Sequence, residues 1–444
     1  MTERTTFTEL GHLPADRHEL QDAVRLLRLP QTNRERSAAI AAAVAGGRSA
    51  HFALDRGRLP ELVRRVVRIT RERYPGPDIP PHTRWRHLEA AGADRPALLD
   101  NRLASLPPAD AARARIDYAA VAVLLDGPVG PEWQYRDAAG RRVGRTEGLA
   151  AAVFDAFAGG RFSSDRRVPL RVDAAALARL DAAELGEILQ VRPDNPLVGL
   201  EGRLRMLHRL ADALQLRSDV FGQPARPGAL LDLLAYASVR APDGSVQRLP
   251  VRRLRAGVVL RTVLKAFGGV WPGGPPLAGK PVGDVWQHPL AGGSGLTAGR
   301  VPFHTYAQWL TLSLVEPLAV GGIQIDLLDE LTGLTGPRHG GLLLDGGVIV
   351  PRDPGFGQTV FTPTDPWVVE WRALTVVLLD ELARAVRAEL GQPALSLASV
   401  VEGGVVAAGR ALAAERRPGG PQAWADPRHS AERNPPHGTI RERP

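Results

Sequence analysis

Side chains that could do chemistry are concentrated in an otherwise apolar stretch between Asp284 and Arg372. Burying carboxylates and arginines is costly unless they are paired or used, so this pattern indicates either structural ion pairs or a site. The set comprises Asp284, His288, His304, Gln308, Glu316, Asp329, Arg338, Asp345, Glu370 and Arg372. Acids beside arginines suit a pocket for a polar ring or a sugar. These residue types alone do not select a reaction.

Tryptophans gather in the same half of the chain. They are Trp271, Trp286, Trp309, Trp367 and Trp371. A tryptophan either fills a core or forms a flat wall against a ring-shaped ligand, and the sequence leaves both roles open.

Several of the polar residues also have a structural interpretation. Asp284 and His288 either organise a turn or contribute to a site. Glu370 and Arg372 flank Trp371 on a predicted helix, where an ion pair to another segment competes with a site role. Asp329 could cap a short helix.

The glycine-rich strings do not match a nucleotide or nucleophile motif. Gly279-Lys280 is followed by Pro281 where a P-loop needs Ser or Thr. Ser294 lies in a Gly-Gly-Ser-Gly-Leu string that departs from the G-x-S-x-G elbow.

No complete metal-ligand set is visible in the sequence. His82 with His87, and Asp284 with His288, would each need a third ligand, and no H-E-x-x-H string occurs. We therefore predict neither a metal nor an organic cofactor.

The composition is that of an ordinary globular protein. The chain has 444 residues, of which 44% are hydrophobic and 23% charged, and it lacks cysteine. Its first twenty residues are polar, which argues against a secretory signal, and no run approaches the roughly 18 apolar residues of a membrane span. The net charge of +8 is scattered rather than arranged in stripes. We expect a cytoplasmic protein that binds neither nucleic acid nor membrane.

The spacing of apolar residues predicts a mainly α, two-lobed globular fold with few short strands. Residues 20–74 read as two helices, followed by a proline-rich loop over 74–89. Further helices are expected at 109–126, 148–158, 172–189, 200–216, 304–318, 325–334 and from Asp365 to Gly391, with Asp365 as cap. Asp345 is expected in a hairpin turn.

These elements suggest a division of the chain. We expect an N-terminal extension over 1–19, a helical lobe over 20–267, a Gly/Pro-rich connecting loop over 268–300, and a second helical lobe carrying the site over 301–415. Residues 416–444 are rich in Pro and Arg without periodicity and read as a disordered tail.

Several strings, in the same order along the chain, resemble the uracil catabolism protein 4 family of the alternative uracil catabolism pathway. They are His82-Thr-Arg-Trp-Arg-His-Leu-Glu89, Pro193-Asp-Asn-Pro-Leu-Val-Gly-Leu-Glu-Gly-Arg203, Gly283-Asp-Val-Trp-Gln-His-Pro289, Val301-Pro-Phe-His304, Gln308-Trp-Leu310, Leu331-Thr-Gly-Leu334, Gly340-Gly-Leu-Leu-Leu-Asp345 and Val369-Glu-Trp-Arg-Ala-Leu-Thr375. Gln308, Arg338 and the strings around Asp329 and Glu370 are also distantly similar to queuosine nucleoside glycosylases, which are helical and related to DNA glycosylases.

Both resemblances imply hydrolysis of an N-ribosyl bond, in a ribosylurea-type compound of pyrimidine catabolism. A carboxylate near the anomeric carbon would stabilise the developing positive charge and orient water. The resemblance suggests Asp329, Glu370 and His304 as catalytic residues. It suggests substrate contacts from Arg372, Arg338, Gln308, Asp284, His288, Trp286, Trp309 and Trp371.

The chain departs from both families at four positions. Thr305 stands where a lysine is usual, Gly336 where an acid is usual, Pro337 where a tyrosine is usual, and His339 where an asparagine is usual. These changes keep a second hypothesis open, namely a catalytically inactive paralogue that binds a nucleoside-like ligand or a pathway partner.

Overall fold

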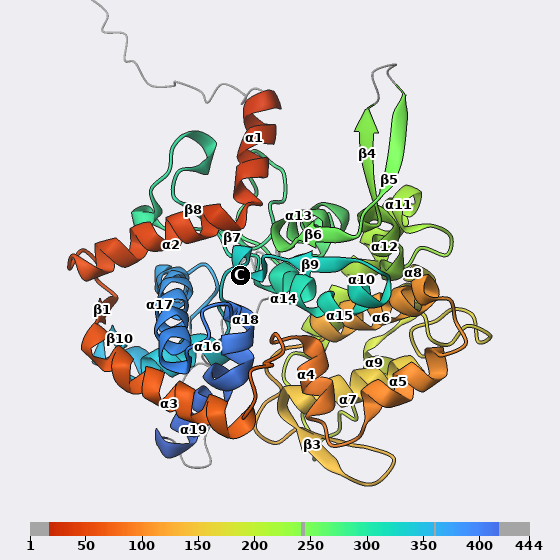
Figure 1. Ribbon diagram of the computed structural model, residues 1–444, viewed down its shortest axis with the longest axis horizontal. Helices are drawn as coiled ribbons and strands as arrows, with labels where there is room; N and C mark the ends of the chain where they lie inside the picture. The colour runs from red at the N-terminus through yellow and green to blue at the C-terminus, as the bar shows by residue number, and fades with distance from the viewer. Residues whose placement is uncertain (1–16, 241–244, 359–360, 417–444) are drawn as a thin grey trace, which may run out of the picture.

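Helices dominate the computed structural model, which describes residues 17–240, 245–358 and 361–416 (Figure 1). The α-helices are α1 (Arg17–Leu27), α2 (Pro30–Ala45), α3 (Leu59–Arg73), α4 (Arg84–Glu89), α5 (Arg95–Leu103), α6 (Pro108–Leu124), α7 (Arg145–Ala158), α8 (Ala174–Arg179), α9 (Ala182–Ile188), α10 (Leu200–Leu216), α11 (Ser218–Phe221), α12 (Leu230–Leu234), α13 (Ala256–Ala266), α14 (Thr305–Ser313), α15 (Val315–Val320), α16 (Pro337–Asp345), α17 (Pro366–Leu390), α18 (Leu397–Val400) and α19 (Val406–Arg416). The mainly α prediction is confirmed.

The strands are short and form two-stranded ribbons. Antiparallel pairs join β1 (Phe52–Leu54) to β10 (Ile349–Pro351), β2 (Gln134–Arg136) to β3 (Arg142–Gly144), β4 (Tyr236–Arg240) to β5 (Val246–Pro250), and β7 (Val285–Gln287) to β8 (Arg300–Pro302). A parallel pair joins β6 (Arg253–Arg255) to β9 (Gln324–Asp326). No described sheet has more than two strands, so helix packing determines the fold.

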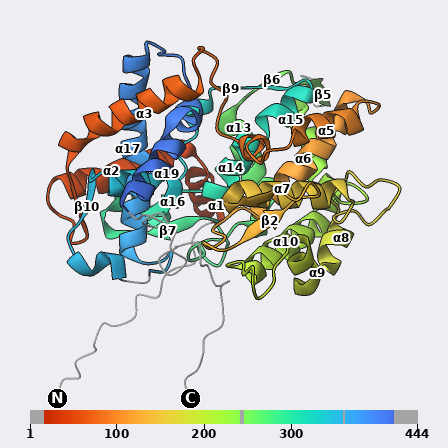
Figure 2. The ribbon, with the colours of Figure 1, turned by 90° about the horizontal axis from the view of Figure 1, so that it is seen from below.

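Two large apolar cores divide the protein. One gathers side chains from residues 85–271 and 307–334, with Ala398. The other combines residues 40–69, 286–303 and 342–412. The first helices and the last helices therefore share a core, and Figures 1 and 2 show α2 and α3 beside α17 in one half of the molecule. The grouping does not follow the lobe boundaries expected from the sequence.

Several expected elements differ from the observed ones. Residues 20–74 form three helices, because Leu29-Pro30 separates α1 from α2. The segment 172–189 forms two helices, each capped by an aspartate: Asp173 accepts from the backbone N–H of Ala176, and Asp181 accepts from that of Glu184. The proline-rich loop over 74–89 ends in α4.

Two predicted elements in the C-terminal half are wrong. Residues 325–334 form only a short 3-10 turn, Leu328–Glu330, and no α-helix, because Ile325 pairs with Leu254 in the β6–β9 ribbon, a partner that local sequence does not reveal. Asp345 is the last residue of α16 rather than part of a hairpin turn. Gly340 lets this helix pack closely, since a Cβ there would lie 2.2 Å from the indole of Trp371.

The remaining sequence expectations concern the Asp365 cap and the two terminal segments. Asp365 precedes α17 as expected but makes no side-chain cap bond to it. The disordered tail predicted for residues 416–444 lies almost entirely outside the described residues, as does most of the expected extension over 1–19.

One helical segment, Leu397–Arg416, is long and apolar enough to cross a membrane by length and composition. Within the protein, 78% of its apolar window is buried, where it packs against α3 and α16. Its composition is therefore explained by its place in a core.

Candidate active site

A cavity of about 590 Å³ opens between the two cores. It is lined by His82, residues 126–131, Trp133, Gln134, residues 144–146, Thr305, Tyr306, Trp309, Leu334, residues 336–339, Arg410, Ala413 and Ala414. Side chains from one core, on α7 and α14, thus meet side chains from the other, on α16 and α19. Pockets that combine aromatic walls with a few polar groups are typical of small-molecule sites.

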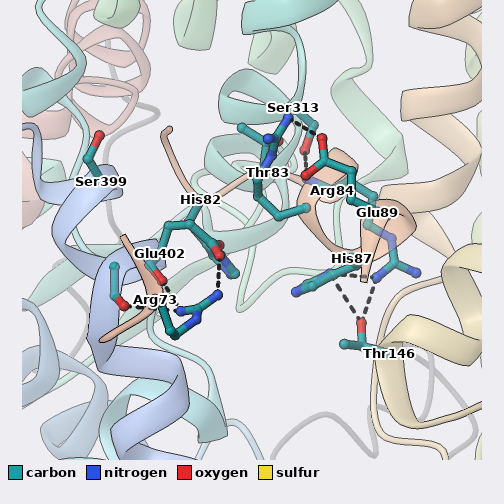
Figure 3. A network of polar contacts seen from close by, with 12 residues as sticks. Arg73, His82, Thr83, Arg84, His87, Glu89, Thr146, Ser313, Ser399 and Glu402 are labelled. Carbon is teal, nitrogen blue, oxygen red and sulfur yellow. Dashed lines mark hydrogen bonds and ion pairs between the residues drawn. The ribbon is translucent and has the colours of Figure 1, made fainter. Parts of the chain in front are cut away.

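His82 and Glu402 form a buried pair at this cavity (Figure 3). The Nδ1 of His82 lies 2.6 Å from the Oε2 of Glu402. Glu402 also accepts from Arg73 Nη2 at 2.8 Å and from the Tyr74 hydroxyl at 3.2 Å. Burial by itself would raise the pKa of Glu402, but the hydrogen bond from His82 and the Arg73 guanidinium lower it below its ordinary value.

An ionised Glu402 fixes the tautomer of His82. It accepts the Nδ1–H, which leaves Nε2 as the basic nitrogen of the neutral ring. Nε2 makes no hydrogen bond within the described part of the chain. This carboxylate–histidine arrangement can hold or move one proton at the cavity wall.

The backbone that presents Glu402 is a π-helical turn, Val401–Val405, inserted between α18 and α19. Two glycines in it lie against α3: a Cβ on Gly404 would come 2.4 Å from the carbonyl oxygen of Val66. Single π-turns inside α-helices are frequent at functional sites, because the extra residue redirects a side chain. Close packing on α3 thus holds Glu402 opposite His82.

Aromatic rings form one wall of the cavity. Trp309 stacks on His82 with ring centroids 4.9 Å apart and an interplanar angle of 29°. His339 packs edge-on against His82 at 5.9 Å. Burial, with smaller effects from His82 and Arg338, lowers the pKa of His339 to about 3, so this ring is neutral. The wall offers flat, uncharged surfaces suited to a planar ligand.

Asp126 supplies a buried carboxylate to the same cavity, just beyond the end of α6. Its Oδ1 accepts from the Thr146 hydroxyl at 2.5 Å, and it lies 3.2 Å from Arg84 Nη1 and 3.7 Å from Arg338 Nη2. Burial opposes ionisation, but the two guanidinium groups and the Thr146 hydrogen bond lower the pKa of Asp126 below its ordinary value. The carboxylate is therefore charged at neutral pH.

Of the site residues predicted from sequence, Arg338 and Trp309 line this cavity. Asp329 lies apart from it at an exposed position. Its Oδ2 accepts from Arg387 Nη2 at 2.6 Å, and its Oδ1 accepts from the backbone N–H of Leu397 at 2.6 Å. These contacts give Asp329 a structural role at the start of α18.

Asp284 and Arg372 form a bidentate ion pair behind the cavity wall. Asp284 accepts from Arg372 Nη1 at 2.9 Å and Nη2 at 2.7 Å, and from Trp286 Nε1 at 2.6 Å. It also accepts from the backbone N–H of Thr305 at 2.8 Å. Burial opposes ionisation, but Arg372 outweighs it and lowers the pKa of Asp284. The pair anchors the start of α14, whose first residue, Thr305, lines the cavity.

Two further predicted residues form a separate buried cluster. Glu370 accepts from the Ser49 hydroxyl at 2.5 Å and lies 3.5 Å from the Nε2 of His288. Neither Glu370 nor His288 is among the residues that line the cavity.

The other predicted residues support the local fold. Gln308 bridges the carbonyl of Phe303 and the side chain of Thr332. His304 Nε2 lies 2.8 Å from the carbonyl of Leu27 in α1, and burial lowers the pKa of this histidine. Trp371 is buried in the second core.

Sequence reasoning missed Glu402 and Asp126, and it treated His82 only as an incomplete metal ligand. Glu402 carried a usable signal: it is the one acid between Leu397 and Leu412, a run otherwise rich in Ala, Val and Gly. An acid in such a run must be buried with a partner. Among the described residues, no group of three or more His, Cys, Asp or Glu side chains could hold a metal ion.

The four departures from the family pattern share one location. Thr305, Gly336, Pro337 and His339 all line the cavity. Any difference in ligand between this chain and its relatives is therefore expected to arise here.

Comparison with known proteins supports the family resemblance that the ordered sequence strings indicated. The family model described as "Protein of unknown function (DUF1688)" matches residues 26–424. "Uracil catabolism protein 4" of Lachancea kluyveri is 31% identical over 401 residues, covering 84% of this chain and 89% of the relative. "Protein urg3" of Schizosaccharomyces pombe (strain 972 / ATCC 24843) is 34% identical over 377 residues, covering 83% and 88%. The chain belongs to the DUF1688 family.

Proposed function

We propose that this chain is a hydrolase of uracil catabolism that cleaves the N-ribosyl bond of a small, ribosylurea-type compound. The name of the Lachancea kluyveri relative, uracil catabolism protein 4, supports the pathway. One observation supports this chemistry. His82, which is paired with Glu402, and the Asp126 carboxylate line the same cavity.

In the proposed reaction, the bond between the anomeric carbon and the ureido nitrogen breaks, and its electron pair goes to the nitrogen. Positive charge develops on the ribosyl group, where the Asp126 carboxylate stabilises it. His82 Nε2 removes a proton from the attacking water while Glu402 stabilises the imidazolium. Oxygen bonds to the anomeric carbon and the nitrogen gains a proton, so the products are ribose and urea.

The aromatic wall has a defined part in this proposal. Trp309 is 95% buried, and its indole Nε1 lacks an acceptor among the described residues. A carbonyl oxygen of a ureido group at the edge of the indole ring would satisfy this donor.

Ribose release from ribosylurea and a panel of ribonucleosides tests the proposal. The His82→Gln and Asp126→Asn variants are expected to lose activity by about 100-fold or more, the usual contribution of general base or electrostatic groups. Asp329→Asn serves as the matched acid-to-amide control, and its activity should stay within about twofold because Asp329 lies outside the cavity. Full activity of the His82 variant would overturn the proposed mechanism.

A second candidate function is a non-catalytic paralogue that binds a nucleoside-like ligand. The observation that favours it is the placement of Thr305, Gly336, Pro337 and His339 at the cavity. Thermal stabilisation by ribosylurea or a nucleoside, with no ribose released from any compound, would support this function over hydrolysis.

A further inference from the structure

Three arginines line the cavity: Arg145, Arg338 and Arg410. Arg410 is paired with Glu147 at 2.5 Å, and Arg338 lies 3.7 Å from Asp126. Arg145 is exposed and forms no ion pair with a described residue. Burial lowers the pKa of Arg410 against the raising effect of Glu147, and the charges of Arg338 and Arg145 add to the lowering.

Two helices begin at the same cavity. α7 starts at Arg145 after Gly144, and α16 starts at Pro337 after Gly336, and all four residues line the cavity. Neither helix has a side-chain cap bond at its N-terminus. The positive end of each helix dipole therefore favours an anion in the cavity, beside the arginines.

Arg145 adopts an unfavourable backbone conformation. Its φ is +58°, in the left-handed region that side chains with a Cβ seldom occupy. Glycine or asparagine would fit this position with less strain. An arginine kept at a strained position beside a cavity indicates that its side chain serves a ligand.

The charges do not balance within the site. The lining residues and their ion-pair partners include four arginines (Arg84, Arg145, Arg338 and Arg410) and three carboxylates (Asp126, Glu147 and Glu402). The excess is one positive charge. A phosphomonoester carries about two negative charges at neutral pH and offers several acceptor oxygens.

We infer that the ribosyl compound bound here carries a phosphomonoester, held by Arg145, Arg338 and Arg410 at the starts of α7 and α16. The inference rests on the proposed function for the ribosyl group. It adds that the substrate is phosphorylated rather than a free nucleoside. The buried Trp309 N–H, which has no acceptor among the residues described, is a further donor at the same cavity, assigned above to the ureido group rather than to the phosphate.

Calorimetric titration of the full chain with ribose 5-phosphate, ribose and inorganic phosphate tests the inference. Ribose 5-phosphate is expected to bind at least tenfold more tightly than either of the others, and its affinity should fall as salt rises. The Arg145→Asn variant should lose at least tenfold in affinity. Arg166→Asn, an exposed arginine away from the cavity, is the matched control and should bind like the unchanged protein.

The Arg145→Asn variant also separates binding from folding. Asparagine tolerates the left-handed conformation, so the melting temperature should be unchanged or higher while affinity falls. A clear loss of melting temperature would contradict the strain argument.

The outcomes distinguish this inference from the proposed function. Equal affinity for ribose and ribose 5-phosphate overturns the phosphate inference even if ribosylurea is hydrolysed. Inorganic phosphate binding as tightly as ribose 5-phosphate reduces the site to a general anion site and also overturns it. Selective binding of ribose 5-phosphate supports the inference even where neither the compounds of the panel nor their 5′-phosphates are hydrolysed, a result that would contradict only the hydrolase.

Discussion

The Nδ1 of His82 lies 2.6 Å from the Oε2 of Glu402, although 320 residues separate the two in the chain. The segment before α4 donates a backbone hydrogen bond from His82 N–H to the carbonyl of Ala398 at 3.0 Å, in α18, which directly precedes the π-helical turn of Glu402. An N-terminal and a C-terminal segment of the chain thus together form one residue pair that can hold or move a proton.

Removing the Glu402 charge is expected to lower kcat for ribose release by about tenfold or more, since an amide stabilises the imidazolium of His82 less than a carboxylate does. KM should stay within about twofold because Glu402 does not line the cavity. Steady-state kinetics of Glu402→Gln measure both constants.

A purely structural role for Glu402 would give a different pattern. Glu402→Asp keeps the charge and should recover part of the lost kcat, while Glu72→Gln, at an exposed pair with Arg68, should change nothing. Equal kcat in Glu402→Gln and the unchanged protein would contradict the role given to the pair.

Asp126→Asn is expected to destabilise the protein by about 3–5 kcal/mol, because it leaves the fully buried Arg84 without its charged partner. Urea unfolding measures the change. Asp100→Asn, which removes an exposed carboxylate paired with Arg115, should cost less than about 1 kcal/mol.

The contribution of Asp126 should depend on pH in a defined direction. Because its folded pKa is lowered, its stabilisation is present above the unfolded value near 3.8 and is lost as pH falls through the lower folded value. The difference between Asp126→Asn and the unchanged protein should therefore be constant near neutral pH and shrink in acid. A difference that grows in acid would contradict this assignment.

The effect of Glu316 on the pH dependence of stability should have the opposite sign. Burial raises the pKa of Glu316 to about 7, although Arg86 lies 2.8 Å away. The folded protein then holds a proton that the unfolded chain releases near its ordinary value of 4.5, so this group makes stability fall as pH rises from 4.5 to 7. Glu316→Gln should flatten the fall, as measured by urea unfolding across that range. An equally steep fall in the variant would exclude Glu316 as its source.

Gly404→Ala is expected to destabilise the protein by about 1–3 kcal/mol, since the added Cβ would meet the Val66 carbonyl at 2.4 Å. It should also lower ribose release, because Glu402 must shift with the π-turn. Gly341→Ala is the control: a Cβ there meets nothing within 4 Å, and alanine in α16 should stabilise by about 0.5–1 kcal/mol. Equal melting temperatures for the two variants would contradict the packing argument.

The amino-acid sequence alone determined the mainly α class and most long helices, because apolar periodicity is a local property. The predicted range 200–216 coincides with α10, and α17 starts at Pro366, directly after Asp365, as expected. The ordered family strings also identified the family correctly.

Only the tertiary structure decided which polar residues meet at one cavity. Three acids looked like site residues in the sequence: Asp329, Glu370 and Asp284. In the structure each is held by a structural partner, which is Arg387, Ser49 and Arg372 respectively. His82, Asp126 and Arg410 lie far apart in sequence and line one cavity between two cores. Contacts of this kind depend on how helices pack across the whole chain, and residue spacing within one segment carries no information about them.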